Sequence, residues 1–181
     1  MTPGRVGMYG LIVAEAAMFT IFVVAYLFYA GKSLGGPTPA DVLHAPIVAT
    51  ICLLSSSVTM HVAVRWWKRG SMSAFAGWWL ATIVLGAIFL TGTAIEWRGL
   101  IYDKGLTIQT NLFGTTYYAL VGLHAFHVTV GLVCVALVSV LAFLGHVKAT
   151  HAERGDVLSL YWHFVDGVWV VVFMVVYIIE R

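Results

Sequence analysis

Five long apolar runs constrain the fold of this chain more than any other feature of its sequence. Each is long enough to cross the ~30 Å hydrocarbon core of a bilayer, which takes about 20 helical residues. Backbone polar groups inside that core must be satisfied within the segment, so each run predicts a helix. The sequence therefore predicts an all-α polytopic membrane protein, with a single transmembrane domain over 1–181 and a bundle of five helices at about 7–31, 45–67, 74–97, 113–145 and 157–179.

The composition agrees with a membrane location. Hydrophobic residues make up 61% of the chain and charged residues only 10%, whereas a soluble domain carries about 25% charged residues. The formal net charge of +2 gives no reason to expect nucleic acid as a partner. The first apolar run is too long for the apolar part of a signal peptide and contains Glu15, so we interpret it as a retained helix.

The basic residues predict the orientation of the chain, because cytoplasmic loops are enriched in Lys and Arg. If the amino terminus is cytoplasmic, six basic residues fall on the inside and four on the outside. We therefore expect a cytoplasmic amino terminus and an external carboxyl terminus. The inside set is Arg5, Arg65, Lys68, Arg69, Lys148 and Arg154, and the outside set is Lys32, Arg98, Lys104 and Arg181.

Ionisable side chains occur at similar depth on three of the predicted helices. Glu15 lies about 6 Å along the axis from the centre of the first helix. His127 and Asp166 lie about 3 Å from the centres of the fourth and fifth, and His124 and His163 about 7 Å from them. Ionisable groups in membranes usually face the interior and pair. These five residues are candidates for a shared proton or hydrogen-bond network; the alternative is that each is a separately satisfied packing residue.

A metal or haem site is not favoured by these residues. A ferritin-like di-iron centre uses Glu-x-x-His pairs and additional carboxylates, whereas this chain offers His-x-x-His and His-x-x-Asp, with Glu15 as the only further carboxylate at depth. A haem site would need histidines that face each other across helices, for which His61 could be recruited. We predict no metal and no catalytic residue in this chain, and interpret the polar residues as serving hydrogen bonding, proton exchange or lipid contact.

Two other polar features have simpler interpretations. The serines at 55–57 and Thr59 favour close packing and hydroxyl bonds between helices. Glu96 stands beside Trp97 and Arg98 near the end of a predicted helix, so we expect a solvated interfacial acid there.

Motifs spread along the chain resemble subunit III of the haem-copper cytochrome c oxidases, in the same order. The most specific is YWHFVDGVW at 161–169, followed by GLHAFHVTVG at 122–131. The segments AEAAMF at 14–19 and LLSSSVT at 53–59 also resemble helices of that family. Many members have seven helices, and this chain corresponds to the last five, so the usual first two are expected to be absent.

The resemblance implies a non-catalytic subunit in a bacterial cytoplasmic membrane. It places haem and copper in partner subunits, with subunit I as the main contact. Subunit II and other respiratory subunits are further expected partners. It implies that the chain binds phospholipid, supports proton uptake and prolongs the working life of the catalytic subunit. Glu15, His127 and Trp162 are the lipid-binding candidates.

Three alternatives stay open at this point. A five-helix protein similar to subunit III also accompanies nitric oxide reductases. A small proton-coupled transporter could use Glu15, His127 and Asp166 as a relay, although the sequence shows neither the inverted repeats nor the broken helices common in transporters. Finally, the polar residues could serve packing alone.

Overall fold

The computed structural model describes residues 2–33, 35–146 and 149–179. Within these ranges it contains helices and no strand, which confirms the predicted all-α fold. Five helices are long and apolar enough to cross a membrane. They are α1 (Pro3–Tyr29), α3 (Ile47–Lys68), α4 (Met72–Tyr102), α5 (Leu112–Phe143) and α6 (Ala152–Phe173), the last of which continues as the π-helical segment η2 (Met174–Ile179).

Local capping sets the helix ends. Pro3 occupies the first turn of α1, where the missing N–H costs no hydrogen bond. Asn111 precedes α5 and accepts a hydrogen bond from the Gly114 N–H through its side chain. Both residues lie outside the apolar runs. Because Pro3 precedes the first run, α1 begins earlier than the sequence predicts. The helix η1 (Ala149–His151) leads into α6.

One short helix, α2 (Pro39–Val42), was not predicted and lies in the connection between α1 and α3. The Thr38 side chain and its backbone N–H both donate to the Asp41 carboxylate, which closes the first turn. These hydrogen bonds hold the pKa of Asp41 below its ordinary value. The bonded carboxylate is therefore retained at neutral pH and lost only as the pH falls into the acid range.

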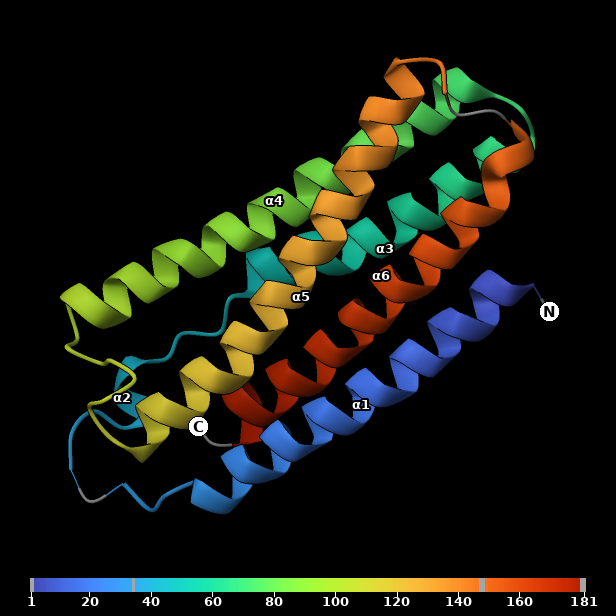
Figure 1. Ribbon diagram of the computed structural model, residues 1–181. Coiled ribbons are helices and arrows are strands. Elements are labelled where there is room, and N and C mark those ends of the chain that lie inside the picture. The colour runs from blue at the N-terminus through green and yellow to red at the C-terminus, as the bar shows by residue number, and fades with distance from the viewer. Residues whose placement is uncertain (1, 34, 147–148, 180–181) are drawn as a thin grey trace.

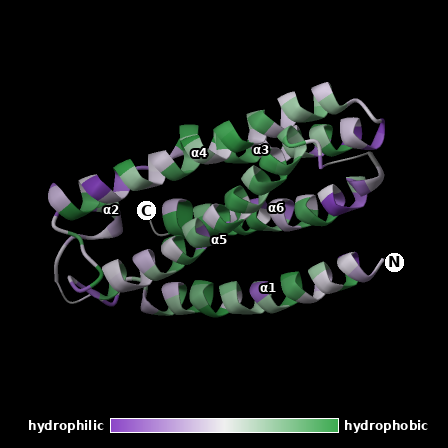
Figure 2. Cartoon of the chain, turned by 45° about the horizontal axis from the view of Figure 1, so that its top comes forward, coloured by the Kyte–Doolittle hydropathy of each residue, from purple (hydrophilic) through white to green (hydrophobic). Residues whose placement is uncertain are grey.

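The long helices run in alternating directions (Figure 1). Helix α6 contacts α1, α3 and α5, whereas α4 packs against α3 and α5. The amino-terminal end of α1 and the end of η2 lie at opposite ends of the bundle (Figure 1). Hydrophobic residues line all five long helices, and many of the hydrophilic residues lie near the helix ends (Figure 2).

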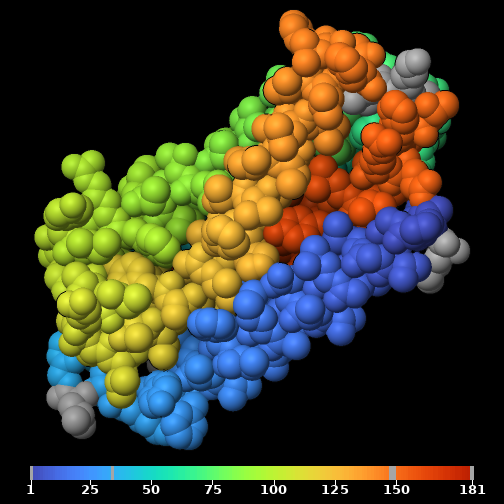
Figure 3. Space-filling view, viewed as in Figure 1, coloured from blue at the N-terminus to red at the C-terminus, as the bar shows by residue number. Residues whose placement is uncertain are grey.

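Helix α1 is peripheral and α6 is central. Only Phe19 and Tyr26 of α1 are buried. Figure 3 shows α1 as a continuous exposed ridge alongside α5 and α6. By contrast, α6 buries three large aromatic side chains, those of Tyr161, Trp162 and Trp169.

Glycine residues let neighbouring helices pack closely around α6. Trp162 is 1% exposed, and a Cβ atom at Gly131 or Gly86 would lie only 3.0 or 3.1 Å from its ring. A Cβ at Gly155 would lie 2.7 Å from the ring of Trp67. The absent side chains leave room for indole rings between the helices, as is typical of close helix packing in membranes.

Candidate functional site

An acid and an imidazole pair across α1 and α5. The Glu15 Oε2 atom lies 3.0 Å from His127 Nε2, and His127 Nδ1 lies 2.8 Å from the Leu123 carbonyl oxygen. A carbonyl can only accept, so Nδ1 carries a proton. The second proton lies between Nε2 and Oε2, in either a neutral acid–imidazole pair or an ion pair. The exposed side-chain fractions are 23% for Glu15 and 7% for His127, so the pair is covered mainly on the His127 side.

A second polar contact joins α3 to α6. The Ser57 Oγ atom lies 2.6 Å from His163 Nδ1. Asp166 stands one turn further along α6 and is 3% exposed. Neither Asp166 oxygen has a hydrogen-bond partner among the described residues. Asp166 is thus a buried acid next to a hydroxyl that is already engaged by His163.

His124 occupies a separate aromatic environment. It is 0% exposed and its ring stacks on Trp169, with centroids 4.9 Å apart and an interplanar angle of 30°. Phe89 meets the same ring edge-on at 5.7 Å. Neither ring nitrogen has a hydrogen-bond partner within the described ranges. An unsatisfied buried imidazole is costly, so the surrounding aromatic packing must hold it in place.

Only one hydrogen bond among the described residues joins two of the five candidates, the one between Glu15 and His127. His163 binds Ser57 instead, and His124 is enclosed by aromatic rings. The single network of all five residues, which we predicted from their similar depth in the membrane, therefore stays a prediction. Trp162 is buried and donates its indole N–H to Ser56 Oγ at 2.9 Å, so lipid contact at Trp162 does not follow from this structure.

Sequence reasoning missed a cluster of Glu96 and two tyrosines. Tyr177 on η2 donates to Glu96 Oε1 at 3.0 Å, and Tyr117 on α5 lies 3.4 Å from the same atom. The two hydroxyls are 3.2 Å apart, and both tyrosines are nearly fully buried. Glu96 is therefore half-buried and ties α4 to α5 and η2, rather than being a simple solvated acid.

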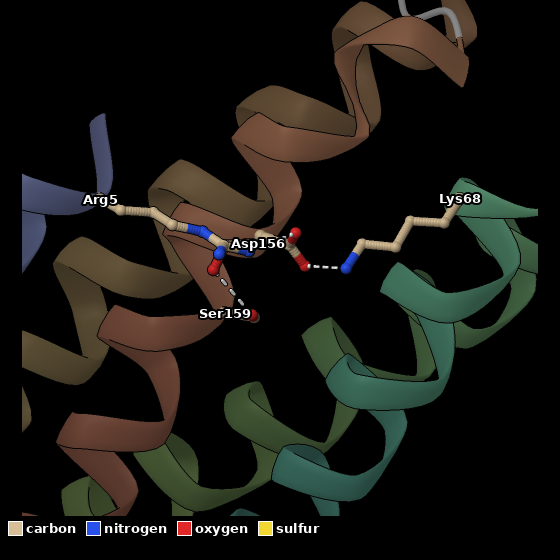
Figure 4. A network of polar contacts seen from close by, with 4 residues as sticks. All are labelled: Arg5, Lys68, Asp156 and Ser159. Atoms are coloured by element: carbon tan, nitrogen blue, oxygen red, sulfur yellow. Dashed lines mark hydrogen bonds and ion pairs between the residues drawn. The ribbon is translucent and has the colours of Figure 1, made fainter. Parts of the chain in front are cut away.

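A second missed cluster joins three helices at the end of the bundle where α1 begins. Asp156 on α6 lies 3.0 Å from Arg5 of α1 and 2.7 Å from Lys68 of α3, as Figure 4 shows. The Ser159 hydroxyl donates to the Asp156 backbone carbonyl. The Asp156 side chain is 16% exposed, so one acid holds two cations in a partly shielded place.

No group of three or more His, Cys, Asp or Glu side chains that could hold a metal occurs among the described residues. Cys52 and Cys134 are free thiols.

The fold and these contacts define the class of the protein. It is an integral membrane protein of five apolar helices, with acid–imidazole and hydroxyl–imidazole contacts between helices at membrane depth. Residues 3–180 match the family described as cytochrome c oxidase subunit III. The chain belongs to that family, which confirms the resemblance inferred from the sequence motifs.

Individual relatives support the assignment. The chain is 34% identical over 166 residues to cytochrome c oxidase subunit 3 of Alkalihalophilus pseudofirmus, covering 91% of this chain and 81% of that protein. It is 42% identical over 136 residues to the protein of the same name in Corynebacterium diphtheriae, covering 74% and 65% of the two chains. It is 38% identical over 181 residues to that of Synechocystis sp., covering 95% and 75%.

Proposed function

We propose that this chain is a non-catalytic subunit III of a respiratory haem-copper cytochrome c oxidase. The observation that carries the proposal is the family match over residues 3–180, which includes all five long helices. Haem and copper would lie in partner subunits, with subunit I as the main contact and subunit II in the same complex. The chain would support the aerobic electron transport of these partners without carrying electrons itself.

Two features support a role in proton uptake and lipid binding. The Glu15–His127 pair holds exchangeable protons at membrane depth, and Glu15 is partly exposed. An apolar groove of about 210 Å³ lies between α1 and α6, and Ala16 and Phe19, both close to Glu15 in sequence, belong to its lining. An acyl chain fits a groove of this character, and the pair could then exchange protons beside it.

The orientation proposed from the sequence also has a structural basis. The amino-terminal ends of α1, α4 and α6 share one end of the bundle with the carboxyl-terminal ends of α3 and α5 (Figure 1). Among the described residues, this end carries Arg5, Arg65, Lys68, Arg69 and Arg154, and the other carries Lys32, Arg98 and Lys104. Lys148 and Arg181, which the sequence prediction also counted, lie outside the described residues. We infer that the basic end faces the cytoplasm of a bacterium.

Cysteine labelling tests this orientation. In a background without Cys52 and Cys134, single cysteines in the segment 70–73, which joins α3 to the first turn of α4, and in the loop 104–107 should react with opposite sidedness in intact cells. A membrane-impermeant maleimide should label 104–107 from outside and should reach 70–73 only after the membrane is opened. Labelling of 70–73 in intact cells would reverse the proposed orientation.

Depletion of the chain from the purified complex tests the proposed function. The haem spectrum and the copper content of the remaining subunits should be unchanged. Turnover should fall increasingly as the pH rises, because proton supply to the uptake path becomes limiting when fewer protons are available. Activity should also decay faster during turnover. Full activity and lifetime from about pH 6 to pH 9 in the depleted complex would contradict the supporting role.

A variant pair separates proton exchange from packing. Glu15→Gln keeps the shape and one hydrogen bond to His127 but loses the exchangeable carboxyl proton. It should give a milder form of the depletion defect, whereas Val13→Ala, a change at a position that is 69% exposed on α1 and outside the groove lining, should leave the pH profile unchanged. Equal profiles for both variants and the native complex would favour the packing interpretation of the pair.

A further inference from the structure

An exposed histidine lies near the middle of α3. His61 is about 5 Å along the axis from the midpoint of the helix and faces outward. Its ring lies 6.4 Å from that of His163, centroid to centroid, and no hydrogen bond to it is present among the described residues. An imidazole that faces hydrocarbon at this depth is costly. The membrane itself offers no partner there, because lipid headgroups lie at the two interfaces.

The exposed imidazole ends a line of polar groups that leads out of the core. Ser57 hydrogen-bonds His163, the ring of His163 lies near that of His61 at a tilt of 48°, and buried Asp166 stands one turn further along α6. Asp166 is 3% exposed and lacks a well-formed hydrogen bond within the described chain. The line therefore has unmet hydrogen-bonding capacity at its buried end and at its exposed end.

The surface around His61 suits a packed helix. On α3, Leu54 and Val58 are exposed on the same face as His61, at the spacing of helical turns. On α6, Gly167 is exposed one turn beyond His163, and nothing lies within 4 Å of the position that a Cβ atom would take there. An open glycine lets another backbone approach closely, which is how helices associate in membranes.

We propose that the α3–α6 face, defined as Leu54, Val58, His61, His163 and Gly167, binds a transmembrane helix of another subunit. That helix carries a polar side chain at mid-membrane depth, which forms a hydrogen bond with the His61 imidazole. A lipid tail cannot supply this bond, and a headgroup cannot reach it. The inference rests on the proposed function only in naming the partner, which would be a catalytic subunit of the oxidase.

Photo-cross-linking in the intact complex tests the face directly. A benzophenone amino acid at Val58 should cross-link to one membrane subunit when the complex is irradiated in its native membrane. The same group at Val133, which is exposed on α5, is the matched control and should not yield that product. Mass spectrometry of the product identifies the partner and the cross-linked peptide, which should come from the middle of a transmembrane helix.

The possible outcomes distinguish a failure of the proposed α3–α6 face from a failure of the proposed function. A cross-link from Val58 to a membrane protein that is not an oxidase subunit would support the face and overturn the proposed function. Oxidase subunits could instead co-purify with the chain while cross-links form from Val133 and none from Val58. That result would support the proposed function and overturn the proposed face. Products formed only with lipid, or only with a second copy of this chain, would also overturn the proposed partner.

Two substitutions of His61 test the hydrogen bond itself. His61→Phe keeps a ring but loses both nitrogens, and the subunit should then be retained about three- to tenfold less well during detergent dilution. His61→Gln keeps a donor and an acceptor and should restore most of the retention. Because His61 is exposed and outside the packed core, folding of the isolated chain should be the same for both variants. Equal retention of the two variants would contradict a hydrogen-bonded contact.

Discussion

Trp162→Ala should lower the free energy of unfolding by about 3–5 kcal/mol, which would be among the largest effects of any single change in this chain. The indole is 1% exposed, fills the space that Gly86 and Gly131 leave, and donates a hydrogen bond to Ser56. Alanine would leave a cavity where α6 meets α3, α4 and α5. The Ser56 hydroxyl, also buried, would keep only its bond to the Leu53 carbonyl.

Unfolding of the purified chain in mixed micelles with increasing denaturing detergent provides the measurement. Trp78→Ala is the matched control, because Trp78 is 42% exposed and should cost far less. Similar losses for the two tryptophans would mean that the glycine-lined space around Trp162 contributes little to stability.

Gly155→Ala should destabilise the chain by about 1–3 kcal/mol, since the added methyl group would overlap the ring of Trp67. The Cβ atom would lie 2.7 Å from two ring carbons, and Trp67 is itself packed against Phe75 and Trp79, so it has little room to move. The same unfolding experiment measures the effect.

Gly77→Ala is the control for that substitution, because nothing lies within 4 Å of its Cβ position and it is exposed in α4. Alanine has a higher helix propensity than glycine, so this change should be neutral or slightly stabilising. The two glycines should therefore give effects of opposite sign. A stabilising effect at Gly155 would show that Trp67 can move aside.

Helix number and helix type were predictable because hydrocarbon imposes length and composition on every spanning segment. The five apolar runs correspond to five long helices. The ends were less predictable, because they depend on caps such as Asn111 and on the capping box of Thr38 and Asp41, which lie in polar sequence.

The candidate site was only partly predictable because depth is a single coordinate. Position along the helix placed Glu15 and His127 within a few ångströms of their helix centres, and the structure pairs them. Rotation about each helix axis decides which neighbour a side chain faces, and neighbouring residues point about 100° apart. His124 and His127 are three positions apart, which turns the helix by about 300° and leaves the two side chains about 60° apart. That smaller angle is enough for His124 to face aromatic rings and His127 to face α1.

The polar clusters near the bundle ends were missed for a different reason. An acid at an interface can be satisfied by water, by a cation or by a hydroxyl, and the sequence around Glu96 or Asp156 does not distinguish these. Their partners come from distant segments: Tyr177 is 81 residues from Glu96, and Arg5 is 151 residues from Asp156. Only the packing of the helices brings such groups together.

The separation of Glu15 and His127 by 112 residues has a consequence for biosynthesis. At about 5–20 residues per second of translation, Glu15 is made roughly 6–22 s before its imidazole partner. Throughout that interval α1 carries an acid without its partner in α5. A polar side chain at membrane depth without a partner is costly, so α1 alone is less favourable in the bilayer than α1 paired with α5. The chain therefore reaches its most favourable arrangement in the bilayer only after the fourth spanning helix has been made.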